Sequence, residues 1–76
     1  MVTMEEARVI AAEWLPDISG CHEFTTAWVF FNPRTGDAVE GPDAPVVVLK
    51  ENGVRCGFKP YMRMLGGGQF LKEFRF

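Results

Sequence analysis

The sequence predicts a small α+β domain in which an N-terminal helix packs on one face of an antiparallel sheet of three to four strands. Three observations lead to this expectation. Thr3 and Glu6 form a T-x-x-E capping box ahead of apolar residues at helical spacing. Residues 23–31 are rich in aromatic and β-branched side chains, which favour strands. Residues 46–50 and 54–59 flank an Asn-Gly pair, the strongest short-range signal for a hairpin.

The helix is expected over residues 3–15, with Pro16 ending it. Its acidic first turn suits the helix dipole. The apolar stripe is Ala7, Ile10, Ala11, Trp14 and Leu15. Because so short a helix does not persist alone in water, we expect this stripe to lie on the sheet.

The strand predicted over residues 23–31 has two apolar faces, because its alternation with polar residues stops at Ala27. Trp28 and Phe30 lie on one face, and Val29 and Phe31 lie on the other. Three turns of helix can cover only one of them. The sequence leaves two alternatives for the other face: the tail or the 38–45 loop covers it, or it is an apolar patch that binds another protein.

The remaining segments are turns and further strands. Residues 16–22 and 32–37 are predicted as turn-rich links, and 38–45 as a loop with a short strand near Val39 as an option. In the hairpin strand predicted over 54–59, Val54, Cys56 and Phe58 lie on one side. Arg55, Gly57 and Lys59 lie on the other side, which we expect to be solvent-exposed.

The tail begins with a flexible glycine break at 66–68. A strand over 69–76 is favoured over a helix, with Phe70, Phe74 and Phe76 on one side. We treat residues 1–76 as one domain, with residues 3–60 as its best-defined part.

Composition points to a cytoplasmic globular protein. Of its 76 residues, 47% are hydrophobic and 24% are charged. No apolar run is long enough to span a membrane, and the acidic N-terminus does not resemble a secretory signal. We therefore expect both cysteines to be reduced rather than joined as a disulfide.

Charge is divided unevenly along the chain. Residues 1–43 hold eight acidic and two basic side chains, a balance of −6, and residues 44–76 hold two acidic and six basic ones, a balance of +4. The two sum to the net charge of −2. An acidic protein is a poor match to nucleic acid, so this class of partner is disfavoured.

No catalytic, cofactor or metal site is expected. The one suggestive cluster is Cys21-His22-Glu23, with Cys56 elsewhere in the chain. Neighbouring side chains on a strand point apart, and the spaced cysteine pairs of a zinc site are missing. The glycines at 66–68 lack the Lys-Ser/Thr of a phosphate-binding loop.

The order of features resembles the YrhB-type domain, a small bacterial family grouped with the immunity proteins of polymorphic toxin systems. The resemblance covers residues 3 to about 60. It lies in the helix EEARVIAAEWL, the strand AWVFFNPRTG, a loop containing Gly41, and the hairpin APVVVLKENGVRCG. It implies a non-enzymatic cytosolic protein that binds and neutralises a cognate toxin.

On this hypothesis Trp28 and Phe30 are the apolar anchors for the partner. Glu40 and Asp43 form an acidic rim that steers a basic toxin. The alternatives are a stress-linked chaperone-like protein, which would bind many clients weakly, and a homodimeric domain that pairs with its own copy.

Overall fold

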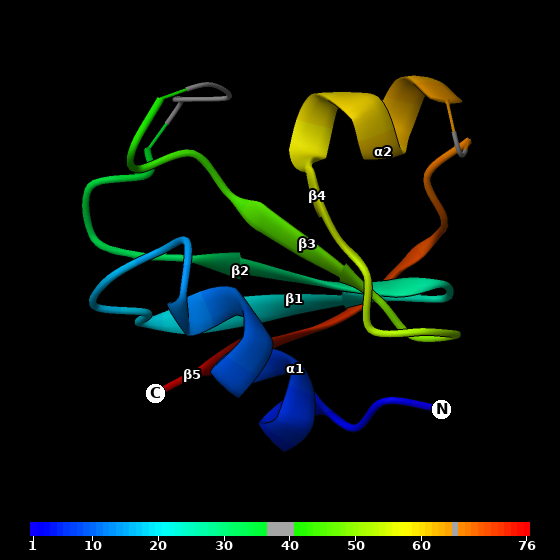
Figure 1. Cartoon of the computed structure of the whole chain (residues 1–76), viewed down its shortest axis with the longest axis horizontal. Helices are drawn as coiled ribbons and strands as arrows, with labels where there is room; N and C mark the ends of the chain where they lie inside the picture. The colour runs from blue at the N-terminus through cyan, green and yellow to red at the C-terminus, as the bar shows by residue number, and fades with distance from the viewer. Residues whose placement is uncertain (37–40, 65) are drawn as a thin grey trace.

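The computed structural model describes residues 1–36, 41–64 and 66–76. The elements in chain order are α1 (Met4–Ala12), β1 (Gly20–Phe24), β2 (Ala27–Phe31), β3 (Val46–Leu49), β4 (Arg55–Gly57), α2 (Phe58–Met64) and β5 (Phe70–Arg75). The strands form one antiparallel sheet in the order β4-β3-β2-β1-β5, with a helix on each side (Figure 1). The predicted α+β class is confirmed, with five strands instead of three or four.

Helix α1 begins as the capping box predicts. The Thr3 hydroxyl accepts a bond from the Glu6 amide at 3.2 Å, and the Glu6 carboxylate accepts one from the Thr3 amide at 3.1 Å. The helix ends at Ala12, so the predicted end at residue 15 is too late. The next turn still buries Leu15, while Trp14 is 52% exposed.

The single strand predicted over 23–31 is wrong: this segment is a hairpin. β1 and β2 pair with Glu23 opposite Trp28, and Thr25 and Thr26 make the turn. Backbone groups from other segments stabilise this turn. The Thr25 amide donates to Gln69 O, and the Thr26 carbonyl accepts from the Lys50 amide, each with a donor–acceptor distance of 3.0 Å. Neither threonine carries the usual turn signal of Gly, Pro or Asn.

The second predicted hairpin is confirmed. β3 pairs with β4, with Val47 opposite Cys56. Gly53 closes the turn at a φ of +72°, a conformation that favours glycine. The second strand ends at Gly57 rather than at residue 59, because α2 begins at Phe58. The optional strand near Val39 lies outside the described residues.

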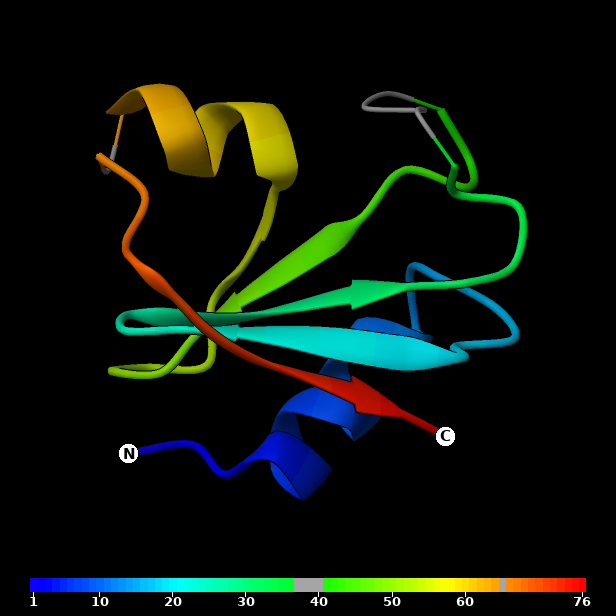
Figure 2. The same cartoon turned by 180° about the vertical axis from the view of Figure 1, so that it is seen from behind.

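β5 confirms the preference for a C-terminal strand and lies at the edge of the sheet beside β1 (Figure 2). A register shift opposite Glu23 and Phe24 changes which side chains share a face. Phe74 pairs with Cys21, while Phe70 pairs with Phe24. Phe70 therefore faces away from Phe74, and the prediction that the two share a side is wrong.

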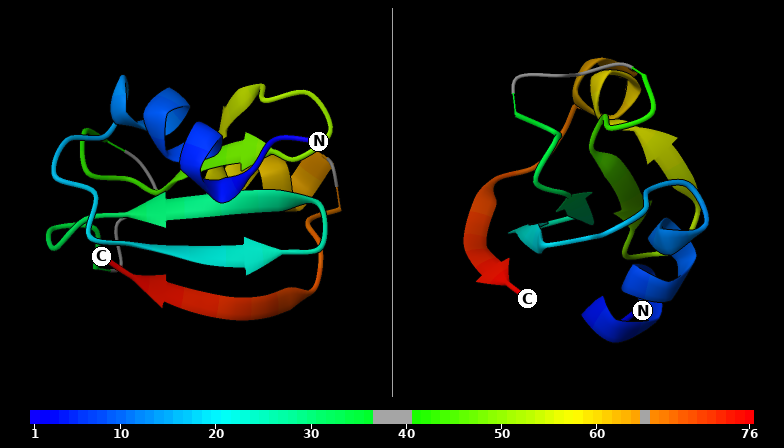
Figure 3. Two further views of the ribbon diagram at one scale, coloured as in Figure 1. Left: turned by 90° about the horizontal axis from the view of Figure 1, so that it is seen from below. Right: turned by 90° about the vertical axis from the view of Figure 1, so that its left-hand side faces the viewer.

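The two faces of the sheet are covered differently (Figure 3). The first face lies under α1. It buries Cys21, Phe30, Val46 and Val48 against Ala7, Ala11 and Leu15, with Trp28 and Phe74 at its margin. The second face lies toward α2. It buries Ala27, Val29 and Val47 against Tyr61, with Phe24, Leu49, Cys56 and Phe58 at its margin.

Ion pairs join the acidic and basic parts of the chain. Glu23 binds Lys50 at 2.7 Å, and Glu13 binds Arg55 at 2.6 Å. Arg55 also donates to the Ile10 carbonyl at 3.2 Å, so α1 covers the side of β4 that was predicted to be solvent-exposed. No described helix has the length and apolar character needed to cross a membrane.

Candidate protein-binding surface

The two aromatic residues predicted as partner anchors are occupied by the protein itself. Phe30 has no exposed surface, so its prediction as a partner contact is wrong for the folded protein. Trp28 is half-buried: its indole Nε1 donates to Val2 O at 3.1 Å, and Lys50 Nζ lies 4.6 Å from the ring centroid. Both face α1, which covers them as the capped helix packs on the sheet.

The predicted acidic rim also differs from expectation. Asp43 accepts bonds from Asn32 Nδ2 and Arg34 Nε, both at 3.1 Å. The hydrogen bond from Asn32, followed by the charge and bond of Arg34, lowers the pKa of Asp43. Asn32 also donates to Pro16 O at 2.9 Å, so Asp43 helps to tie three loops together. Glu40 lies outside the described residues.

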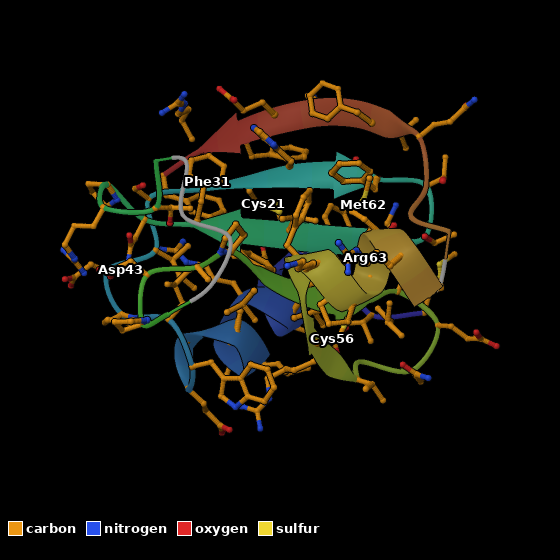
Figure 4. All side chains as sticks on the ribbon, turned by 90° about the horizontal axis from the view of Figure 1, so that it is seen from above. Cys21, Phe31, Asp43, Cys56, Met62 and Arg63 are labelled. Atoms are coloured by element: carbon orange, nitrogen blue, oxygen red, sulfur yellow. The ribbon has the colours of Figure 1, made fainter. Side chains whose placement is uncertain are left out.

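On the second face, α2 covers the sheet only in part. Tyr61 is 1% exposed and packs against β2 and β3. Its hydroxyl lies 2.6 Å from Thr26 Oγ1, which fixes the helix above the β1–β2 turn. Figure 4 shows α2 over one half of this face, and the ribbon of β1 between α2 and β5.

Among the described residues, a hollow of about 610 Å³ lies on this face beside α2, and residues on both sides of segment 37–40, Gly36 and Pro45 among them, help to line it. We call it the Phe31 hollow. Its apolar lining includes Val29, Phe31, Pro45 and Phe58, and its polar lining includes His22, Glu73 and Arg75. Phe31 and Phe58 are half-buried, so both rings retain surface that a ligand can contact.

The Phe31 ring lies across the backbone of β1. A Cβ on Gly20 would stand 2.4 Å from the Phe31 ring, so only glycine allows this approach. The His22 ring meets Phe31 edge-on, with centroids 5.0 Å apart, and the Arg75 guanidinium carbon lies 5.5 Å from the Phe31 centroid. Phe31 is therefore held between strand backbone and polar neighbours.

Glu73 joins the polar groups of the hollow. Its carboxylate lies 2.8 Å from His22 Nε2 and 2.8 Å from Arg75 Nε. The hydrogen bond from His22, then that from Arg75, lowers the pKa of Glu73.

The Cys21-His22-Glu23 cluster separates as alternation along a strand requires. Cys21 faces α1, where burial raises the pKa of its thiol to about 12. His22 lines the Phe31 hollow on the opposite face of the sheet. Cys56 lies on that same face but outside the Phe31 hollow. Across residues 1–36, 41–64 and 66–76, no group of three His, Cys, Asp or Glu side chains is placed to hold a metal ion.

A second hollow, of about 830 Å³, lies between α2 and the 41–46 segment. Cys56 and Pro60 line it, with Arg63 at its margin. Trp14 also borders this hollow, but its ring is stacked by Arg55, whose guanidinium carbon lies 4.6 Å from the ring centroid. Trp14 is 52% exposed, more than the half-buried Phe31, so each hollow has an aromatic ring in its lining. The Phe31 hollow differs in that its lining holds charged groups of both signs, Glu73 and Arg75.

Comparisons with models of known protein families, with curated proteins and with solved structures return no match to this chain.

The residues of the Phe31 hollow were not predicted as a site. Alternation places Phe31 on the second face of its strand, and that signal was available. The approach of Glu73 and Arg75 depends on β5 pairing with β1, more than 50 positions earlier in the chain. No local pattern in the sequence reports this pairing.

Proposed function

We propose that this chain is a non-enzymatic protein-binding module that takes an apolar side chain of a partner protein into the Phe31 hollow. The observation that carries the proposal is that, among the described residues, α2 leaves the Phe31 ring at the wall of a largely apolar hollow. Half-exposed aromatic rings in a concave site are typical anchors of protein interfaces.

The surroundings of the ring support this assignment. Val29, beneath the hollow, is only 3% exposed, and Gly20 lets the ring rest on the backbone, so the floor is rigid before a partner arrives. A preformed floor lowers the entropy cost of binding. Glu73 and Arg75 add one charge of each sign at the margin, which suits recognition of a specific partner.

The resemblance to YrhB-type immunity proteins suggests the partner class. We propose a toxin as the partner and the bacterial cytoplasm as the site of action. A toxin would form one tight complex. The chaperone-like alternative, in which the same hollow accepts unfolded chains, predicts weak binding to many apolar peptides.

Sequencing the gene immediately upstream and, where it encodes a toxin domain, titration calorimetry with that purified domain test this function. We expect a one-to-one complex that Phe31→Ala weakens at least about tenfold, as loss of an interface anchor does. Val9→Ala removes an apolar side chain that is 70% exposed on α1 and should leave affinity within about twofold. A neighbouring gene that encodes no toxin domain, or equal affinity of the two variants, would contradict the proposal.

An anionic aromatic dye, anilinonaphthalene sulfonate, tests the surface without a partner. Its rings match the apolar lining and its sulfonate matches Arg75. Saturable fluorescence should fall several-fold in Phe31→Ala and stay unchanged in Val9→Ala. Equal signals from all three proteins would mean that the Phe31 hollow does not accept apolar ligands.

A further inference from the structure

β5 presents a free edge of the sheet. In the described part of the chain it pairs only with β1. The Phe76 amide donates to Ser19 O at 2.9 Å, which sets the direction of its backbone groups. Because these groups alternate along an antiparallel strand, those of Phe74 and Lys72 also face β1. The amides and carbonyls of Glu73 and Arg75 therefore point away from the sheet.

We propose that a second copy of this chain pairs with the free edge, β5 to β5 and antiparallel, with Glu73 of each copy opposite Arg75 of the other. A free edge of this kind is a template for strand addition. The charges along β5 favour a second copy of the same chain as the partner. Glu73 and Arg75 are two residues apart on one strand, so a two-fold axis places each of them opposite a residue of the other sign.

The register follows from two conditions. First, the residues whose backbone groups point outward must form the hydrogen-bonded pairs between the two strands. Near the centre of the paired strands these residues are Glu73 and Arg75, so each must lie opposite one of these two residues in the other copy. Second, a shift by two residues in either direction places Glu73 opposite Glu73 or Arg75 opposite Arg75, and like charges directly opposite are destabilising. Only the register with Glu73 opposite Arg75 forms two favourable charge pairs.

This register also gives a favourable pairing on the first face. Phe74 meets Phe74 of the other copy at the two-fold axis, as a non-hydrogen-bonded pair with close side chains. Phe74 is half-buried within one chain, where it lies 6.4 Å from Trp28 between ring centroids. Lys72 comes opposite Phe76, which is 45% exposed and offers its ring to the ammonium group.

The dimer would build one continuous sheet from both copies. Since the two-fold axis runs perpendicular to the sheet, both Phe31 hollows open on the same side, separated only by the paired β5 strands. Glu73 and Arg75 of each copy then bind across the seam as well as within the chain. This inference does not depend on the proposed function.

Light scattering after size exclusion, over a wide range of protein concentration, tests the dimer. We expect the measured mass of the wild type to rise toward twice the protomer mass as the concentration increases. Arg75→Glu places a carboxylate opposite Glu73 of the other copy, so we expect this variant to keep the mass of one protomer. Arg63→Glu makes the same charge change at an exposed position on α2 and should dimerise as the wild type does.

The double variant E73R/R75E separates the register from a general charge effect. It exchanges the two signs, so the same alignment again forms two opposite-charge pairs, and dimerisation should return. A monomeric wild type at all concentrations overturns the proposal, as does Arg75→Glu dimerising like the wild type. A folded double variant that stays monomeric overturns the register.

Proline substitution checks the edge itself. Arg75→Pro removes an outward amide and should give a folded monomer, whereas Phe74→Pro removes a bond to β1 and should destabilise the fold. Dimerisation by folded Arg75→Pro would exclude the β5 edge. Phe31→Ala should leave the dimer intact, so failure of the proposed function and failure of this inference give different results.

Discussion

The two faces of the sheet receive one helix each, yet in the described part of the chain the second face retains a hollow beside its helix. Nine-residue α1 places Ala7 and Ala11 over the centre of the sheet, Leu15 from the following turn extends this cover, and Phe74 from β5 fills the margin. Seven-residue α2 packs Tyr61 against β2 and against Phe24 at the end of β1, where the two ring centroids lie 6.1 Å apart. Phe30 and Phe31, adjacent in sequence, consequently have different surroundings: one in the core and one at a hollow. The contrast indicates that an apolar strand keeps accessible aromatic surface where the second covering helix is short, and this surface is the one that we propose for binding.

Thiol labelling should give the largest contrast between the faces. Cys21 is fully buried on the first face, and burial raises the pKa of its thiol to about 12. Cys56 is half-buried on the second face, and burial also raises its pKa. A thiol that reacts only on unfolding is slowed by at least about a thousandfold for a stability of about 5 kcal/mol.

We therefore expect Cys56→Ser, which retains Cys21, to react with an alkylating reagent about a thousandfold more slowly than Cys21→Ala, which retains Cys56. Mass spectrometry over time measures both rates. Adding urea should remove the difference. Similar rates in native buffer would show that the first face is not closed.

Alanine substitution of the adjacent phenylalanines should give the next largest contrast. Phe30→Ala removes a fully buried ring and should cost about 3–5 kcal/mol of unfolding free energy. Phe31→Ala removes a half-buried ring at the wall of the hollow and should cost about 1 kcal/mol. Urea denaturation followed by tryptophan fluorescence measures both, and equal losses would place the two rings in equivalent surroundings.

The smallest effect concerns the margin of the Phe31 hollow. His22, then Arg75, lowers the pKa of Glu73 by hydrogen bonding. A carboxyl whose pKa is lowered by folding stabilises the protein above its unfolded pKa, and this contribution is lost as pH falls through the folded value. Glu73→Gln should therefore lower stability slightly at neutral pH and leave it unchanged in strong acid.

Urea midpoints near about pH 7 and about pH 3, at concentrations where the chain is monomeric, measure this difference. Glu51→Gln removes an exposed turn carboxylate and serves as the control. A Glu73→Gln deficit that persists undiminished at the acidic pH would mean that the carboxylate charge is not its cause.

Much of the fold could be predicted where the cause is local. The Thr3–Glu6 capping box and the Asn52-Gly53 turn act within a few residues, so the first helix and the second hairpin were identified correctly. The Thr25–Thr26 turn could not be found this way, because bonds from Gln69 and Lys50 secure it. Helix α2 was missed because Pro60 and the neighbouring glycines mask a short helix that its packing stabilises.

The candidate surface was only partly predictable, for a related reason. Aromatic density pointed to the strand that contains Trp28 through Phe31, and Phe31 of this strand lines the hollow that we propose for binding. It did not show which face α1 covers, so the buried Phe30 was chosen in place of Phe31. Charge counting suggested Asp43 for a partner, but its hydrogen bonds with Asn32 and Arg34 hold the loops together.

The order β4-β3-β2-β1-β5 has a consequence for how the chain assembles. β1 through β4 are consecutive neighbours and can form as they leave the ribosome, whereas β5 must return to the first strand across a large loop. The entropy of closing that loop makes β5 the last strand to dock and the first to detach. Until it docks, a nascent chain displays β1 as its edge, and a copy pairing there would form a swapped assembly.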